Sequence, residues 1–462
     1  MSIQANALSD LRASIQGRLI TSQDADYDAA RTVFYGGIDR RPGVVVRVAN
    51  ADDVARTIVW ASAAGVELAV RGGGHSFAGH SLSEGGAVID LRELKGLEID
   101  GERSTAWAEA GLTAGEYTLA ASAHDLATGF GDTGSVGLGG LTLGGGVGYL
   151  VRKHGLTIDN LLAAELVTAR GEILRVDAQA HPDLFWAIRG GGGNFGVVTR
   201  FQFRLHPMPE CVGGILILPA TPDTIASFLG EAEAAPDELS TIANVMPAPP
   251  MPMIPAEMHG RLVLFAILAF AGGAESGERT LAPFRKLATP IADLVRPIRY
   301  PELYLPDDES YHPTAAARTL FVDSVDGQVA REILDRLEAS DASMRVAQLR
   351  VLGGAMARVP VEATAFAHRR SRIMANLAAF YAGPQDRPQK EAWVSEFEGA
   401  LRQQDTGVYV NFVGDEGSAQ VRNAYPTSTW DRLVAVKQRY DPDNLFHVNH
   451  NIPPKADAPL AR

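Results

Sequence analysis

The pattern of apolar and polar positions divides the first part of the chain into short strands and helices. Val54, Ile58 and Ala61 recur at helical spacing and predict a helix over 52–64, capped by Asn50 and ended by Gly65. Alternating or continuous apolar runs predict strands at 66–70, 86–91, 165–168, 172–176 and 197–205. This mixture is typical of an α+β fold built in layers.

The pattern changes after Pro207. Glycine clusters become rarer, a proline- and methionine-rich stretch follows at 246–258, and the apolar run 262–271 predicts a buried strand, too short for the ~20 residues of a membrane-spanning helix. An alternating strand at 408–412 and a helix at 429–440 are expected near the end. We therefore expect one domain over 1–207, a second over 208–405, and a C-terminal segment over 406–462 that returns to the first.

Composition and charge exclude several classes of partner. A net charge of −13 without a basic run argues against binding to nucleic acid or to anionic membranes. Cys211 is the one cysteine, so an internal disulfide and a cysteine-built metal site are excluded, and no metal is expected. The first ten residues have neither the basic start nor the apolar core of a secretory signal, which predicts a cytoplasmic protein. The oligomeric state is left open.

Three glycine-rich segments lie in the first domain, at 71–80, 131–148 and 189–196. The last contains G-x-G-x-x-G at 191–196, but a dinucleotide fingerprint follows a strand and opens a helix, whereas a predicted helix precedes this segment and a predicted strand follows it. A Walker sequence is also absent. Glycine lets backbone N–H groups approach a pyrophosphate or a flat ring. One segment alone could form only tight turns, but three together indicate a large anionic cofactor.

Five ordered segments resemble berberine-bridge-enzyme-like FAD-linked oxidases, members of the vanillyl-alcohol oxidase and p-cresol methylhydroxylase flavoprotein superfamily. They are Arg71–Ser76, Gly137–Gly148, Lys153–Asn160, Asp183–Val198 and Tyr440–Phe446. The resemblance extends from about residue 25 to 453 and is loose in the middle domain. It implies a two-part FAD-binding domain and a substrate domain with an antiparallel sheet covered by helices.

The resemblance implies that His75 carries FAD through the 8α-methyl group of the flavin; otherwise His75 only hydrogen-bonds phosphate or backbone. Many relatives have a second linking cysteine where this chain has Thr133, and Cys211 lies outside that motif. We therefore predict FAD bound covalently at His75 only. The residues expected to bind the cofactor are Arg71, Gly72, Gly73, Gly74, His75, Ser76, Gly79, His80, Thr133, Gly134, Val136, Gly137, Gly139, Gly140, Gly145, Gly148, Val197, Val198, Asn449 and Asn451.

Some of these positions carry more specific expectations. The resemblance makes Val136 a small gate that admits oxygen to the flavin, unless Val136 simply packs in its turn. It also makes Tyr409 the base, with a lowered pKa, or a residue that orients the substrate; a hydrogen-bonded core tyrosine is the alternative. Asn411 lies on the same face of the predicted strand as Tyr409 and shares the catalytic assignment. Asn449 and Asn451 are expected near the flavin, although surface residues would look the same.

These expectations lead to an FAD-dependent oxidase that takes hydride from a small organic alcohol or amine and reduces oxygen to hydrogen peroxide. The low aromatic content of 7% and the methionine- and proline-rich stretch favour an apolar or aromatic substrate over a sugar. A carbohydrate oxidase, a flavin dehydrogenase with another acceptor and a non-catalytic flavin-binding protein are the alternatives. The substrate cannot be assigned from the sequence.

Overall fold

The computed structural model describes residues 3, 5–306, 308 and 310–455. Its chain forms three main sheets, and the predicted α+β fold is confirmed. In the first sheet, β2 (Val44–Arg47), β4 (Ala87–Asp90) and β3 (Leu68–Arg71) are parallel, with β1 (Arg18–Ile20) antiparallel at the edge. The valines of β2 are fully buried because apolar clusters cover both faces of the sheet.

Helix α3 (Ala51–Ala64) connects β2 to β3 and confirms the predicted helix and both of its ends. The Asn50 side chain accepts a hydrogen bond from the backbone N–H of Asp53 at 2.9 Å. Gly65 ends the helix with φ 61°, a left-handed conformation that glycine adopts without steric cost. The chain then enters β3, which leads directly into the first glycine-rich loop.

The second sheet is antiparallel, and its order is β5 (Leu97–Asp100), β6 (Thr105–Glu109), then β10, β8 and β9. The predicted strand pair is a hairpin of β8 (Leu161–Val167) and β9 (Ile173–Asp177), and the predicted strand at 197–205 is β10 (Val197–Arg204). Helix α7 (Pro182–Ala187) precedes the third glycine-rich segment and β10 follows it. The segment therefore follows a helix and precedes a strand, which is the reverse of the order in a dinucleotide-binding fingerprint.

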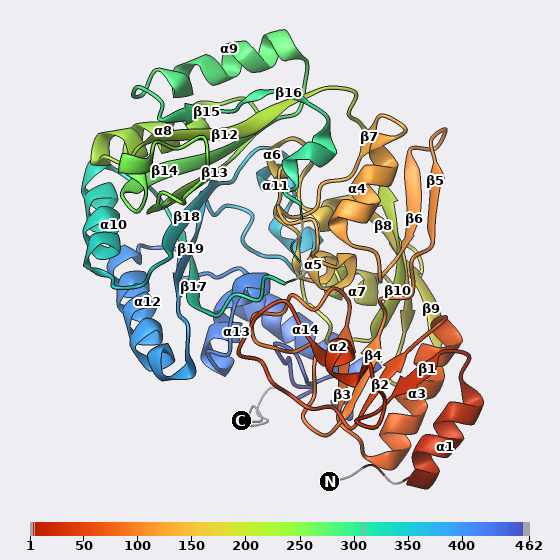
Figure 1. Ribbon diagram of the computed structural model, residues 1–462. Coiled ribbons are helices and arrows are strands. Elements are labelled where there is room, and N and C mark those ends of the chain that lie inside the picture. The colour runs from red at the N-terminus through yellow and green to blue at the C-terminus, as the bar shows by residue number, and fades with distance from the viewer. Residues whose placement is uncertain (1–2, 4, 307, 309, 456–462) are drawn as a thin grey trace.

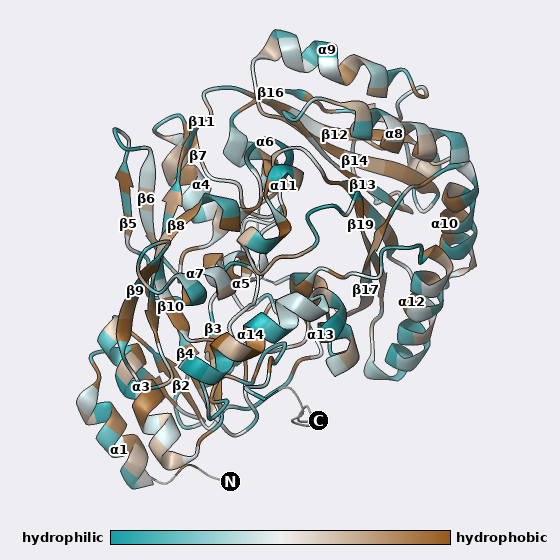
Figure 2. Cartoon of the chain, turned by 180° about the vertical axis from the view of Figure 1, so that it is seen from behind, coloured by the Kyte–Doolittle hydropathy of each residue, from teal (hydrophilic) through white to brown (hydrophobic). Residues whose placement is uncertain are grey.

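The third sheet has eight strands, and neighbouring strands run antiparallel to each other. Four helices pack on its outer face, α8 (Pro222–Ala234), α9 (Ala274–Arg285), α10 (Gly327–Ala339) and α12 (Arg387–Leu401). Figure 2 shows apolar colour along the strands and mixed polar and apolar colour on these helices. The inner face is turned toward the first part of the chain. The strands are β12 (Cys211–Pro219), β13 (Leu239–Pro247), β14 (Leu262–Phe270), β15 (Ala292–Asp293), β16 (Arg296–Ile298), β17 (Ala315–Val322), β18 (Arg345–Val351) and β19 (Ile373–Phe380).

The end of the described chain packs against its beginning. Helix α14 (Thr427–Tyr440), close to the predicted span, lies with α13 (Ser418–Ala424) between the third sheet and the first part in Figure 1. Trp430 and Leu433 belong to the same buried cluster as the strands of the first two sheets. No helix in the described residues is long and apolar enough to cross a membrane.

The predicted strand over 408–412 is wrong. The backbone is extended at Tyr409 but then closes into a short 3-10 helix over Val410–Phe412, with the Phe412 N–H donating to the Tyr409 carbonyl at 2.9 Å. Alternation usually marks a strand with one solvent face. Here Val408, Tyr409 and Val410 are all buried, so the segment is enclosed on every side and has no sheet partner.

Several further helices precede the strands of these sheets or lie between them in the chain. They are α1 (Ala5–Ser14), α2 (Tyr27–Arg31), α4 (Ala114–Ser122), α5 (Leu138–Gly144), α6 (Val151–His154) and α11 (Ala355–Arg358). The short strands β7 (Leu126–Ala127) and β11 (His206–Pro207) pair with each other in a separate two-stranded sheet.

Candidate active site

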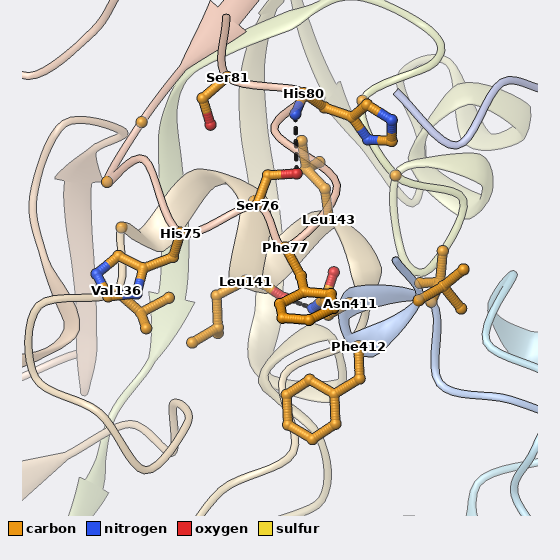
Figure 3. Close-up of a pocket in the computed structure, with 18 of the residues that line it drawn as sticks. His75, Ser76, Phe77, His80, Ser81, Val136, Leu141, Leu143, Asn411 and Phe412 are labelled. Atoms are coloured by element: carbon orange, nitrogen blue, oxygen red, sulfur yellow. Dashed lines mark hydrogen bonds between the residues drawn. The ribbon is translucent and has the colours of Figure 1, made fainter. Parts of the chain in front are cut away.

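A cavity of about 500 Å³ lies where the first part of the chain, the inner face of the third sheet and the C-terminal segment meet. Sixteen of the residues predicted to form the site line this cavity. They are Gly72, Gly73, Gly74, His75, Ser76, His80, Thr133, Val136, Gly137, Gly139, Gly140, Val197, Val198, Tyr409, Asn411 and Asn449. Figure 3 shows His75, Val136, His80 and Asn411 arranged around it.

Two glycine-rich loops make the cavity narrow on one side. A Cβ atom on Gly73 would lie 2.3 Å from the backbone N of Gly137, and one on Gly137 would lie 2.2 Å from the backbone N of Gly73. The two backbones therefore touch, and only glycine fits at either position. On Gly140 and Gly193, which also line the cavity, an added Cβ would meet no protein atom within 4 Å. A side chain there would occupy open space in front of the backbone.

Six predicted residues do not line the cavity. Arg71 and Gly79 support the first loop, since the Arg71 guanidinium donates hydrogen bonds to the Ala30 and Thr32 carbonyls and Gly79 packs on Ile38. The Gly134 carbonyl accepts from the Gly115 N–H at 2.8 Å. The side-chain oxygen of Asn451 is buried without a hydrogen-bond partner in the protein.

Gly145 and Gly148, the other two, allow close packing of the chain instead of contact with the cavity. A Cβ atom on Gly145 would lie 3.1 Å from the Phe366 ring and 3.3 Å from the Tyr409 ring. On Gly148 it would lie 1.4 Å from the Phe130 carbonyl oxygen. The missing side chains at these two glycines therefore let Tyr409, Phe366 and the Phe130 backbone pack closely against this part of the chain.

His75 and Val136 both line the cavity. The His75 ring stacks on Phe34, with the ring centroids 4.2 Å apart. One turn further along, the Ser76 hydroxyl accepts a hydrogen bond from the His80 N–H at 3.1 Å. The His80 ring meets that of His450 edge-on. Burial lowers the pKa of His80 well below its usual value and that of His450 to about 4, so both are neutral at pH 7.

Tyr409 and Asn411 come together although their segment is not a strand. The Tyr409 hydroxyl accepts hydrogen bonds from the Gly146 N–H and from Asn411 Nδ2, both at 2.9 Å, and Asn411 Nδ2 also donates to the Leu141 carbonyl. The expected lowering of the Tyr409 pKa is wrong. Burial raises this pKa, and it outweighs the lowering effect of the hydrogen bonds from Gly146 and Asn411.

The inner face of the third sheet supplies residues that the sequence alone did not single out. Ala315 and Ala317 of β17, Ala378 of β19 and Val346 of β18 form an apolar surface. Next to it, Gln348 and Asn376 face each other across β18 and β19. The sequence offers one signal for Asn376, which is a single carboxamide between the apolar Met374 and Ala378 on the same face of β19.

A buried ion pair connects this sheet to the loop that carries Thr133. Arg350 of β18 pairs with Asp132 and donates to the side-chain oxygen of Gln348 from Nε at 3.0 Å. Gln348 in turn donates from Nε2 to Asn244 at 3.0 Å, so its amide has a defined orientation. Of the described lining residues, Asp132 and Arg350 carry the carboxylate and guanidinium charges, and these charges offset each other.

Aromatic side chains close the remaining side of the cavity. Tyr35 meets the Phe77 ring edge-on at 4.8 Å between centroids, and Phe412, which follows Asn411 in the chain, also lines the cavity (Figure 3). Burial raises the pKa of Tyr35 to about 12, which keeps it protonated. The cavity therefore has a glycine-walled part, an apolar and carboxamide part, and an aromatic border between them.

Comparison with known proteins agrees with this architecture. Residues 42–177 match the FAD binding domain family, and residues 408–453 match the family described as berberine and berberine like. The chain is 30% identical to (R)-6-hydroxynicotine oxidase of Paenarthrobacter nicotinovorans and 30% identical to the FAD-linked oxidoreductase YgaK of Bacillus subtilis. Each alignment covers 96% of this chain and 98% of the relative.

Solved structures give the same result. The crystal structure of 6-hydroxy-D-nicotine oxidase from Arthrobacter nicotinovorans superposes with a TM-score of 0.85 at 28% identity, covering 96% of this chain and 99% of the other. BBE-like 1 of Physcomitrella patens shares the fold, with a TM-score of 0.86 at 23% identity over 98% of this chain and 99% of the other. Fold, cavity and relatives together define an FAD-linked oxidoreductase. The chain belongs to the berberine-bridge-enzyme-like family of the vanillyl-alcohol oxidase superfamily.

The cavity fits FAD. The glycine loops leave a space that a Cβ on Gly140 or Gly193 would fill, and backbone N–H groups and the Ser76 and Ser81 hydroxyls lie along it. These groups are suited to hold a diphosphate without a cationic side chain. Asn449 also lines the cavity and donates from Nδ2 to the Gly193 carbonyl at 3.3 Å, while its buried side-chain oxygen has no hydrogen-bond partner among the described residues.

Proposed function

We propose that this protein is an oxidase that takes two electrons from a small organic alcohol or amine and passes them to oxygen, which gives hydrogen peroxide. When bound, FAD supplies the chemistry that accepts a hydride from the substrate and returns the electrons to oxygen. The supporting observation is the composition of the inner sheet face, where an apolar surface adjoins a carboxamide pair within the same cavity as the glycine loops.

This sheet face favours a neutral substrate. Ala317, Ala378 and Val346 leave room for an apolar group, and Gln348 with Asn376 can hydrogen-bond a hydroxyl or a neutral nitrogen. The charge of Arg350 is offset by Asp132, so an organic acid would gain little from it. We therefore expect the enzyme to oxidise uncharged alcohols, or amines in their unprotonated form.

Tyr409 is proposed to take or orient the proton of the reacting group. As a neutral phenol it has both lone pairs occupied by N–H donors, and its own O–H is available to donate to a substrate oxygen. As a phenolate it would be stabilised by the same donors and could accept a proton. Asn411 is proposed to fix this hydroxyl in place.

His75 is proposed as the single covalent attachment point for FAD, with Thr133 unable to form a second bond. Val136, which lines the same cavity as His75, is proposed to leave access for oxygen. A side chain as small as valine supports this assignment because it leaves space in front of the glycine loops.

A substrate panel under anaerobic conditions tests this function. We expect a neutral aromatic or aliphatic alcohol or amine to bleach the flavin absorbance, and oxygen to restore it with one hydrogen peroxide per turnover. Stopped-flow mixing with air measures the second step. Reduced flavin that persists for minutes in air would exclude an oxidase and favour a dehydrogenase. A panel in which only sugars reduce the flavin would show that the substrate class is wrong.

A further inference from the structure

Phe34 covers one face of the His75 imidazole. The two ring centroids are 4.2 Å apart, and the planes differ by 19°. Both residues line the cavity. Stacking fixes the rotation of a histidine ring about its bond to Cβ, which is otherwise a broad, weakly restricted torsion. Because imidazole nitrogens form bonds in the plane of the ring, a stack on the face restrains the ring without covering those in-plane lone pairs.

Phe34 is itself held by the loop that carries His75. The Phe34 N–H donates to the Gly74 carbonyl at 3.1 Å, directly before His75. The Arg71 guanidinium, at the start of the same loop, holds the carbonyl of Thr32 two residues before Phe34. On the other side, His312 Nδ1 donates to the Phe34 carbonyl at 3.2 Å. The two stacked rings are thus connected through a short and well-tethered stretch of backbone.

We propose that Phe34 is a positioning residue that holds the His75 imidazole in the orientation from which its bond to FAD forms. This inference rests on the proposed covalent link at His75. The reacting nitrogen is in-plane, so a ring free to rotate would spend only part of its time aimed at the cavity. Fixing that rotation in advance raises the rate of bond formation, although Phe34 itself gives up or takes no atom, proton or electron.

Attachment of FAD to His75 is a two-electron oxidation. A carbon–nitrogen bond forms between the 8α carbon and one imidazole nitrogen, and one C–H bond of the methyl group and the N–H bond of the imidazole are broken. The two hydrogens, with two electrons, are transferred to oxygen as hydrogen peroxide. Oxygen is the oxidant that the proposed function already uses. Phe34 is unchanged throughout.

The test follows the attachment of FAD to flavin-free protein in air. At each time the protein is precipitated with acid, and the flavin that remains in the pellet is measured by absorbance and by intact mass. We expect Phe34→Leu to slow attachment roughly ten-fold. Phe34→Tyr, which keeps an aromatic plane, should stay within about two-fold of wild type. Reversible binding of FAD is measured by fluorescence before attachment in every variant, and attachment rates are compared at FAD concentrations that saturate each of them.

Tyr311→Leu is the matched control. Tyr311 meets the Phe34 ring edge-on, at 6.3 Å between ring centroids, and does not line the cavity. Removing the Tyr311 ring should leave the rate of FAD attachment within about two-fold of wild type. Equal slowing in Tyr311→Leu and Phe34→Leu would point to general loosening of the loop and overturn the proposal, as would wild-type attachment in Phe34→Leu. Phe34→Met serves as a second aliphatic variant if Phe34→Leu folds poorly.

Failure of the underlying function has a different signature. If wild-type protein releases all of its FAD on acid precipitation, the covalent link itself is absent. If wild type and Phe34→Leu both retain flavin at equal rates while His75→Ala retains none, the link is correct and the role of Phe34 is wrong.

Discussion

At the scale of single residues, the Tyr409 hydroxyl combines two opposing influences. It is fully enclosed, which penalises the phenolate, and it accepts N–H hydrogen bonds that favour the phenolate. Burial is the larger effect, so the hydroxyl stays protonated at pH 7. Its role as a base therefore depends strongly on pH, unlike that of a histidine poised near neutrality.

The rate of flavin reduction by substrate should rise with pH throughout the alkaline range. The Tyr409 pKa lies above the ordinary value of 10.0, so the phenolate fraction still increases with every step from pH 7 to 10. Tyr409→Phe should remove this rise and lower the rate by roughly 10²- to 10³-fold. Anaerobic stopped-flow measurement of flavin reduction from pH 7 to 10, in the wild type and in Tyr409→Phe, tests both expectations.

Tyr117→Phe is the control for this measurement. Tyr117 is also buried and its hydroxyl lies 3.0 Å from Thr128 Oγ1, but it is not a cavity residue. The variant should keep the pH dependence. A flat profile in the wild type, or an unchanged one in Tyr409→Phe, would show that Tyr409 is not the base.

At the scale of elements, regular local patterns were predictable and enclosed irregular segments were not. Helix α3 and strands β3, β4, β8, β9, β10 and β14 follow from periodicity with caps or glycine at their ends, because local sequence decides them. The 408–412 segment alternates like a strand but turns at Phe412, since its surroundings rather than its neighbours determine its shape. Predicting that turn needs the third sheet, which is distant in the chain.

The same distinction applies to the site. The glycine loops and His75 are contiguous motifs, and they do line the cavity. Gln348, Asn376 and Arg350 meet the cavity only because β18 and β19 pair in one register, with Gln348 opposite Asn376. A one-residue shift would turn all three side chains to the helix-covered face. Sequence motifs cannot specify that register.

Two glycines, one in the second glycine-rich segment and one in a helix, should respond to alanine in opposite directions. Gly148→Ala places Cβ 1.4 Å from the Phe130 carbonyl oxygen and should destabilise the fold by about 3 kcal/mol or more. Gly230→Ala, inside α8, meets nothing within 4 Å and should stabilise it by about 0.5–1 kcal/mol, because alanine favours helix. Urea unfolding of flavin-free protein measures both. Equal effects would contradict the packing role of Gly148.

At the scale of the whole molecule, a stacked histidine pair lies where the first part meets the third sheet. The His154 and His206 rings are 3.8 Å apart, and His206 Nε2 lies 2.6 Å from Asn160 Oδ1. The neighbouring Lys153 donates to the Ala271 carbonyl, just past β14. Burial lowers the pKa of His154 to about 3 and that of His206 to about 4.

This pair should make the molecule sensitive to acid. Folded-state pKa values below the unfolded value of 6.5 mean that the unfolded chain binds protons first, so stability is complete above pH 6.5 and is lost as the pH falls toward 4. At pH 5, each histidine should lower the free energy of unfolding by roughly 1–2 kcal/mol relative to neutral pH. His80 and His450 act in the same direction.

Urea unfolding at pH 7.5, 6 and 5 measures this dependence. His206→Phe keeps an aromatic ring and removes one titrating group, so its unfolding midpoint should fall less between pH 7.5 and 5 than that of the wild type. His124→Gln changes an exposed histidine and should behave as the wild type does. A steeper loss in His206→Phe would contradict the assignment.

The C-terminal segment has a consequence for how the protein is made. Tyr409, Asn411 and Asn449 complete a cavity whose other walls are supplied by residues as early as Phe34. On the ribosome, a nascent chain that has emerged only to residue 400 contains the strands of all three main sheets but lacks one side of the chamber. A complete cavity for the cofactor therefore exists only after the C-terminal segment has been synthesised and has packed against the rest of the chain.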